Sequence, residues 1–122
     1  MYPILRGSVP RDGAEMIEML ELRPNCELCD ADLPPDSPAA RICTYECTYC
    51  VRCVEDVFGD VCPTCGGNFM PRPIRPQQAW RKDLNLGLRF HPASRERRRN
   101  AWTGEQIAEL AQRLRGVAPD QR

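Results

Sequence analysis

The cysteines are the feature that most constrains how this chain of 122 residues can fold. All eight fall within forty residues, in the pattern C-x2-C-x13-C-x3-C-x2-C-x2-C-x8-C-x2-C, at Cys26, Cys29, Cys43, Cys47, Cys50, Cys53, Cys62 and Cys65. A window this short rarely buries enough apolar surface to fold unaided, so it needs cross-links or metal. Each C-x2-C pair lets two sulfurs reach one ion at about 2.3 Å. The spacing therefore predicts two structural Zn²⁺ ions, each held by four thiolates.

Two ligand pairings are compatible with this spacing. In the sequential scheme, the first four cysteines hold one ion and the last four hold the other. In the interleaved scheme, one ion is held by Cys26, Cys29, Cys50 and Cys53, and the second by Cys43, Cys47, Cys62 and Cys65. We favour the interleaved scheme because Cys47 and Cys50 are only three residues apart. A chain that passes alternately between two braced centres accommodates that crowding.

The residues around the ligands resemble those of the RING finger, with cysteine in place of the usual histidine. Apolar or aromatic residues flank the ligands at Leu28, Ile42 and Tyr49, and Pro63 lies inside the last pair. From about Met19 to Pro76, the motifs MLELRPNCELC, LPPDSPAARIC, ECTYC and CPTCGG are similar to a family of short bacterial cysteine-rich proteins known only as a domain of unknown function. The resemblance implies a zinc-binding module and supplies no activity.

The RING resemblance raises the hypothesis of a ubiquitin ligase. In that family, a bulky aromatic residue on the central helix and a cation just after the last ligand help to engage the conjugating enzyme. The matching positions here are Val57 and Gly66, so both features are missing. The sequence therefore does not favour the ligase interpretation.

The fold we predict is a small zinc-stabilised α+β module over residues 19–70, with a RING-like or treble-clef-like cross-brace. It would contain a short hairpin around Ile42–Tyr49 and a helix from about Val51 to Phe58. Residues 1–18 are predicted to form a leader and the start of a short helix that begins at Asp12, in the run DGAEMIEMLEL.

The C-terminal part is predicted to be a linker, a flanking helix and an irregular basic tail. The prolines of MPRPIRPQQ begin a Pro-rich and then basic linker over residues 71–101. Residues 102–117 form the clearest amphipathic helix, with Thr103 and Gln106 as a capping box and Gly116 as the stop. Residues 118–122 follow as a tail. The apolar face of this helix needs a partner surface, on the module or on another protein.

The two halves of the chain carry opposite charges. Residues 1–66 have 12 acidic and 5 basic side chains, whereas residues 67–122 have 5 acidic and 12 basic ones. The tail is therefore expected to fold back onto the head. In the segment SRERRRNAW, phosphate contacts are conceivable through Arg95, Arg97, Arg98 and Arg99, with Trp102 stacking a base. The acidic head would repel nucleic acid, so we keep this as an alternative.

The function we expect is that of a protein-interaction adaptor rather than an enzyme. A closed four-thiolate site leaves no position for substrate, and we see no C-x2-C pair in the strand-to-helix setting of a redox thiol. His91, the single histidine, is predicted to be a surface residue. The residues proposed for protein contact are Leu28, Val54, Val57, Phe58, Ile107, Leu110 and Leu114. For the first four of these, core packing is the first expected role and protein recognition the second.

The alternatives are a nucleic-acid-binding zinc protein that uses residues 95–102 and, ranked last, a RING-type ubiquitin ligase or a thiol redox enzyme. No apolar stretch of membrane-spanning length and no secretion signal is present, so we expect a cytoplasmic protein without a membrane partner. A reducing compartment keeps clustered cysteines available for metal.

Overall fold

The computed structural model describes residues 19–122. The predicted leader, 1–18, lies outside this range, and so does most of the helix predicted from Asp12. The four residues of that helix that are described, 19–22, are not helical. In the described part of the chain, no helix is both long enough and apolar enough to cross a membrane.

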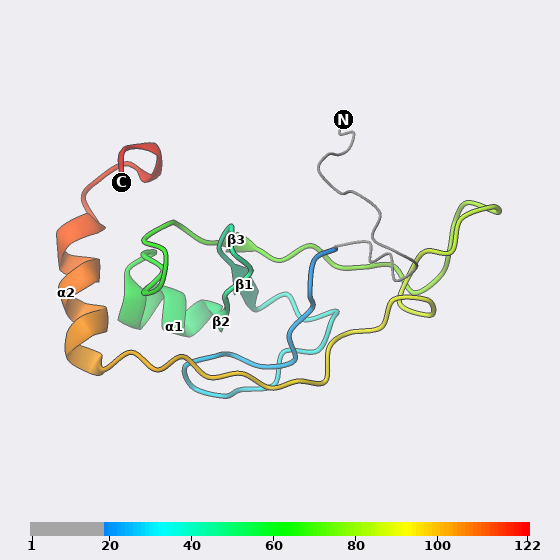
Figure 1. Ribbon diagram of the computed structural model, residues 1–122, viewed down its shortest axis with the longest axis horizontal. Helices are drawn as coiled ribbons and strands as arrows, with labels where there is room; N and C mark the ends of the chain where they lie inside the picture. The colour runs from blue at the N-terminus through cyan, green and yellow to red at the C-terminus, as the bar shows by residue number, and fades with distance from the viewer. Residues whose placement is uncertain (1–18) are drawn as a thin grey trace, which may run out of the picture.

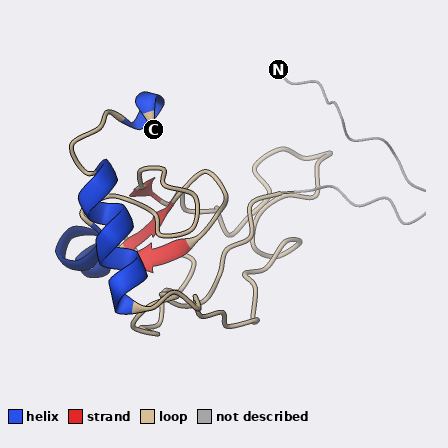
Figure 2. Ribbon diagram, turned by 60° about the vertical axis from the view of Figure 1, so that its left-hand side comes forward, coloured by secondary structure: helices blue, strands red, loops and turns tan. Residues whose placement is uncertain are grey.

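The strands form a three-stranded antiparallel sheet in the order β2-β1-β3, drawn in red in Figure 2. The strands are β1 (Ala40–Ile42), β2 (Thr48–Cys50) and β3 (Met70–Pro71). The first two form the predicted hairpin, with Ile42 opposite Thr48. Strand β3 lies at the edge, where Pro71 is tolerated because an edge residue needs no ladder N–H. The sheet therefore ties the middle of the cysteine window to the segment that follows its last cysteine.

Strand β2 runs directly into the predicted helix over Val51–Phe58. This helix has two parts, a turn of α-helix in α1 (Val51–Cys53) and a widened π turn in η1 (Val54–Phe58). It ends at Gly59, whose φ of 58° is the left-handed conformation that glycine adopts at low cost. The junction places Cys50 at the end of a strand and Cys53 on a helix.

An aromatic cluster fills the core between the sheet and the helix. Tyr49 and Phe58 are fully buried with ring centroids 4.5 Å apart, and Phe69 lies edge-on to Tyr49 at 5.6 Å. Such edge-to-face pairs add to the stabilisation that comes from burial. Leu33 and Val54 complete this core together with the cysteines. Val54 and Phe58 face inward, so of the two roles expected for them, core packing and protein recognition, they serve core packing.

Helix α2 (Gly104–Leu114) covers one side of η1 (Figure 1). Its predicted capping box is present, since Thr103 Oγ1 accepts from the Gln106 N–H and Gln106 Oε1 accepts from the Thr103 N–H. Ile107 and Ala111 are buried against the module. The apolar face of the helix therefore finds its partner within the chain. A single 3₁₀ turn, η2 (Pro119–Gln121), follows.

Residues 72–103 contain no helix or strand. Residues 94–102, which we call the strap, run back along the loop that contains the first two cysteines (Figure 1). The Ser94 N–H donates to Leu22 O at 3.0 Å, and the Asn100 N–H donates to Glu27 O at 2.9 Å. Farther along, Trp102 Nε1 donates to Thr64 Oγ1 at 2.9 Å. The strap thus contacts both the first and the last cysteine pair.

Candidate metal centres

The first group of sulfurs is contributed by a turn, a strand end and a helix. The sulfurs of Cys26, Cys29, Cys50 and Cys53 all lie within 4.8 Å of one another. The first two come from a tight turn in which the Asp30 N–H donates to Cys26 O at 2.9 Å and Asp30 has a φ of 66°. The Cys29 N–H points toward Cys26 Sγ at 3.5 Å. Backbone amides of this kind stabilise a thiolate ligand.

The sulfur–sulfur distances within this group fit an ion with tetrahedral coordination. Cys26 Sγ lies 3.8 Å from Cys53 Sγ, and Cys29 Sγ lies 3.8 Å from Cys50 Sγ. Four sulfurs at about 2.3 Å from a shared ion stand about 3.8 Å apart, which is the edge of the tetrahedron. A disulfide would bring two sulfurs to about 2.05 Å, and all eight cysteines are free of disulfides. The donor set therefore suits a thiolate-binding metal.

The second group has three sulfurs within 4.8 Å of one another, those of Cys43, Cys47 and Cys62. Cys65, the predicted fourth ligand, lies in the same turn, which is closed by the Gly66 N–H donating to Cys62 O at 2.8 Å. Its own sulfur stays outside the group and accepts from the Gly67 N–H at 3.3 Å. The structure thus brings together three of the four predicted ligands and places the fourth beside them.

The two groups alternate along the chain, because cysteines of the second group both precede and follow Cys50 and Cys53. The hairpin produces this alternation, since β2 carries the chain from Cys47 to Cys50 in three residues. This is the arrangement of the interleaved scheme, and the sequential scheme would have put Cys50 and Cys62 together.

The thiol groups of the second cluster interact strongly. Hydrogen bonds from Cys47 and Cys62 lower the pKa of Cys43 to about 2, against the effect of burial. The hydrogen bond to Cys43 raises the pKa of Cys47 to about 11, and the pKa of Cys62 rises for the same reason. Without a cation, one thiolate is therefore stabilised by neighbours that keep their protons. A bound metal replaces those protons, so metal uptake should release them.

One part of the argument against a redox thiol is wrong. The Cys50–Cys53 pair does stand where a strand enters a helix. Both sulfurs of this pair nevertheless lie within 4.8 Å of those of Cys26 and Cys29, which is the arrangement of a metal centre.

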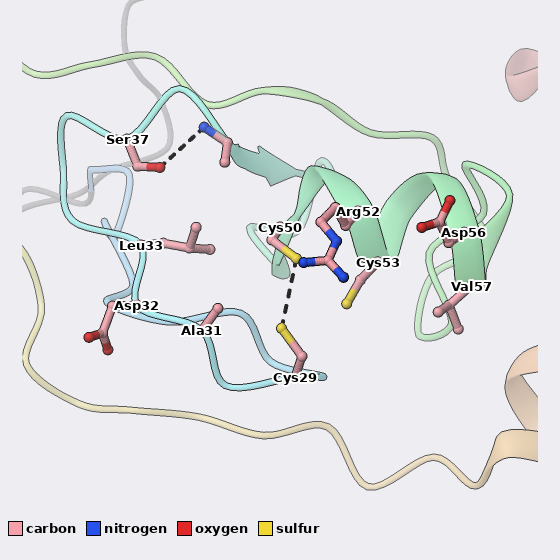
Figure 3. A pocket seen from close by; sticks show the side chains of 11 residues that line it. Cys29, Ala31, Asp32, Leu33, Ser37, Cys50, Arg52, Cys53, Asp56 and Val57 are labelled. Carbon is pink, nitrogen blue, oxygen red and sulfur yellow. Dashed lines mark hydrogen bonds between the residues drawn. The ribbon is translucent and has the colours of Figure 1, made fainter.

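A shallow hollow of about 360 Å³ lies beside the first group (Figure 3). One wall is the turn of Cys29 and Ala31 with the loop that follows, and the other is the helix from Arg52 to Val57. Most of the lining is apolar, with Asp32, Arg52 and Asp56 as its charged residues. No local pattern in the sequence signals this hollow, because its walls come from segments twenty residues apart.

The predicted contact residues are mostly covered. Val54 and Phe58 are buried in the core, which is the first of the two roles expected for them, and Ile107 is buried where α2 docks on the module. Leu28 is partly buried against the core, and Leu110 and Leu114 are partly buried on α2. Val57 is different, since it is 43% exposed and lines the hollow.

Three of the predicted phosphate contacts bind the module instead. Arg97 pairs with Asp30 and Asp32, Arg98 pairs with Glu21, and Arg99 donates to Leu28 O. Arg95 is exposed. His91, predicted to lie on the surface, has Nε2 2.9 Å from Asn85 O in the linker.

Glu21 joins the strap to the start of the described chain. Burial raises its pKa, but hydrogen bonds from Arg23, Ser94 and Arg98 outweigh that effect and lower it overall. The basic segment thus folds onto the acidic head through specific contacts.

Comparisons with known proteins cover the module and little else. The sequence model of a family described as "Protein of unknown function (DUF1272)" matches residues 19–75. An uncharacterized protein of Rhizobium meliloti (strain 1021) is 58% identical over 64 residues, which are 52% of this chain and 76% of that protein. No solved structure matches the chain. The matched family region includes all eight cysteines and ends before the strap.

Proposed function

This chain belongs to the family of proteins of unknown function DUF1272, and we propose that its module holds two structural Zn²⁺ ions and acts as a protein-interaction adaptor in the cytoplasm. The observation that carries the metal part is the first group, in which four sulfurs lie within 4.8 Å of one another and two pairs stand 3.8 Å apart, the edge length of a zinc–thiolate tetrahedron. Soft thiolates in this geometry select zinc or iron–sulfur chemistry, and a closed set of four suits a structural zinc ion.

The metal would supply much of the folding free energy of the module. Its sheet has strands of only two or three residues, and the apolar core is limited to a few side chains around Tyr49 and Phe58. Structural zinc contributes roughly 10–16 kcal/mol of apparent binding free energy, which a core of this size does not match. Cys65 would complete the second site by turning its sulfur from Gly67 toward the other three ligands.

The adaptor part of the proposal is supported by which surfaces of the module are covered and which are exposed. The strap and α2 cover one side of the module, while the hollow beside the first metal group stays open. Val57 and the apolar lining of that hollow give a rigid recognition surface whose shape depends on the metal.

Elemental analysis of the protein purified without chelator tests the metal proposal. Two zinc per chain are expected, because eight thiolates fill two tetrahedral sites. One metal per chain, or iron, would contradict it.

The variant Cys50→Ser tests which cysteines share an ion. Cysteine Cβ chemical shifts should show Cys26 and Cys29 losing their metal, while Cys43 and Cys62 keep theirs. If Cys26 and Cys29 instead stay metal-bound and Cys62 is released, the interleaved pairing is wrong.

A photo-crosslinking residue at position 57 tests the adaptor role in cells. It should yield a discrete cross-linked protein, whereas the same residue at position 109, on the exposed side of α2, should not. Equal labelling from both positions would contradict a specific surface. The nucleic-acid alternative receives less support, since Arg97, Arg98 and Arg99 contact the module itself.

A further inference from the structure

The strap contacts the module in the way that an extended peptide contacts a receptor. It contains no helix or strand, and it runs beside the loop of the first cysteine pair (Figure 1). Near its start, the Ser94 N–H donates to Leu22 O at 3.0 Å. Near its end, the Asn100 N–H donates to Glu27 O at 2.9 Å. Main-chain hydrogen bonds of this kind hold extended peptides in many receptors.

Asn25 contacts the backbone of the strap at its middle. This residue is fully buried, and both ends of its amide reach Arg98. Its Nδ2 donates to Arg98 O at 2.8 Å, and its Oδ1 accepts from the Arg98 N–H at 3.2 Å. Removal of the strap would take these hydrogen bonds from a buried side chain, which is costly. The face of the module that receives the strap is therefore built to be occupied by a polypeptide backbone.

Side chains of this face add a preference for two adjacent arginines. Arg97 pairs with Asp30 Oδ1 at 3.1 Å and with Asp32 Oδ1 at 2.8 Å. Arg98 Nη2 lies 3.2 Å from both carboxylate oxygens of Glu21. Because neighbouring side chains of an extended chain point to opposite sides, two adjacent arginines can reach different carboxylates. The face is thus suited to an extended segment with an Arg-Arg pair.

The strap lies on the surface and can leave without opening the core. None of its residues is buried; each is exposed or partly buried. Helix α2, which follows the strap, is anchored differently, since Ile107 is 5% exposed and Ala111 is 1% exposed. Segments held by exposed hydrogen bonds open at a low free-energy cost, whereas packed elements do not. The strap can therefore detach while α2 stays docked.

The face and its occupant belong to different parts of the chain. All the residues that contact the strap here lie in the matched family region, residues 19–75, whereas the strap itself lies outside that region. The family region thus contains a binding face without the segment that fills it.

We propose that this face binds an extended, arginine-rich segment of another protein, and that the strap is an intramolecular ligand which the partner displaces. The pattern that fits is Arg-Arg-x-Asn, as in residues 97–100, because Asn100 Nδ2 also donates to Glu27 O and to Tyr49 OH, each at 3.3 Å. The inference deepens the adaptor part of the proposed function and rests on it, since the metal of the first group would hold the turn that carries Asp30.

Fluorescence anisotropy with a labelled peptide of the strap sequence, SRERRRNAW, tests this face. The open variant is the full chain with Arg97→Glu, Arg98→Glu and Asn100→Ala, in which the carboxylates of the face repel the strap. It should bind the peptide about tenfold more tightly than the wild-type chain or better, because a tethered strap competes at an effective concentration on the order of millimolar. Equal affinities would overturn the inference.

Two altered peptides separate recognition of the strap sequence from attraction by charge. A scrambled peptide of the same composition keeps the net charge. A peptide methylated on the backbone nitrogen of Arg98 keeps every side chain but cannot donate to Asn25. Each should bind the open variant about tenfold more weakly than the strap peptide, the factor that corresponds to a loss of about 1.4 kcal/mol. If either binds as well as the strap peptide, the face does not recognise an extended backbone and the inference fails.

Arg95→Glu is the matched control variant, because Arg95 lies in the strap and is exposed. This chain should exclude the peptide as the wild type does, and binding equal to that of the open variant would contradict displacement of specific contacts. Zinc is measured on every sample. An open variant that holds two zinc ions and does not bind refutes the peptide-binding face alone, whereas a wild-type chain without zinc refutes the proposed function.

Sedimentation velocity shows whether a second copy of the chain supplies the strap instead. The wild-type chain should keep its monomer mass of 13.9 kDa as its concentration rises. A wild-type dimer that the open variant does not form would mean that copies exchange straps, and it would overturn the assignment of the face to another protein.

Discussion

Asn25 is the residue that most directly attaches the strap to the module. It is fully buried, its Nδ2 donates to Arg98 O at 2.8 Å, and its Oδ1 accepts from the Arg98 N–H at 3.2 Å. The same amide also donates to Asp30 Oδ1. Arg97 attaches the strap through ion pairs with Asp30 and Asp32, but its side chain is 43% exposed. Water and salt screen such pairs.

We therefore predict that Asn25→Ala destabilises the protein more than Arg97→Ala does. Asn25→Ala leaves backbone groups of the strap without partners and should lower the free energy of unfolding by about 1–3 kcal/mol. It should also expose the amides of Arg98 and Asn100 to hydrogen exchange. Urea unfolding and exchange measurements on both variants check this. Equal effects of the two changes would mean that ion pairs hold the strap.

Two buried charges show what residue patterns alone do not predict. Glu27 stands between the first two cysteines, where a charged side chain is expected to face water, yet it is 7% exposed and accepts from the Thr48 N–H and from Arg23. Arg72 follows β3 in a proline-rich run, yet it is buried and donates to Arg23 O, Leu33 O and Pro34 O. Arg23 is four residues from Glu27, but the other partners are 21 to 49 positions away, so no local pattern predicts that these two charges are buried.

At the scale of elements, α2 depends on the apolar stripe through which it meets η1. Ile107 is 5% exposed and Ala111 is 1% exposed, while the rest of the helix is exposed or partly buried. Most of the stability of a short helix comes from such packing rather than from helix propensity. A cavity at Ile107 should therefore weaken both the helix and its docking.

We predict that Ile107→Ala costs about 2–5 kcal/mol of unfolding free energy and reduces the helical signal of circular dichroism. Gln112→Ala on the exposed face serves as control and should leave both quantities nearly unchanged. If the two variants behave alike, the docking of α2 on the module is wrong.

The elements that sequence patterns predicted well are those with local signals. The capping box of α2 is set by residues three apart, and the hairpin and the helix after it lie between cysteines of fixed spacing. From the opposite charges of the two halves, the sequence predicted that the basic segment folds back onto the acidic head, but it did not predict the contacts of the strap. These contacts join residues about 70 positions apart, such as Asn25 and Arg98. The hollow and the inward position of Val54 also depend on tertiary packing. Within the candidate site, the cysteine spacing correctly predicts that three sulfurs of the second group lie together. The side-chain orientation of Cys65 cannot be predicted from spacing.

For the whole molecule, the strap connects the two metal groups to α2. Asn100 and Arg99 bond the turn of Glu27 and Leu28 in the first group, and Trp102 bonds Thr64 inside the last cysteine pair. Both turns owe their shape to the cysteines at their ends. Loss of metal should therefore release the C-terminal region as well as the module.

We predict that excess chelator shifts the fluorescence of Trp102 toward that of exposed indole and makes residues 94–114 susceptible to protease. A Trp80→Phe background isolates the Trp102 signal, because these are the two tryptophans of the chain. High salt without chelator is the control and should leave the strap bound through Asn25 and Asn100. A C-terminal region that stays protected after metal removal would show that it folds independently.

The distance in sequence between the strap and its binding surface also sets an order of events during biosynthesis. The last cysteine leaves the ribosome thirty-five residues before Asn100 does. At about 5–20 residues per second, that interval lasts on the order of 2–7 s. Metal capture can be complete before the polypeptide that covers the first turn has been made. During synthesis, the turn of Glu27 and Leu28 is therefore accessible to other molecules until the strap has been made. The rate of translation sets the length of this period.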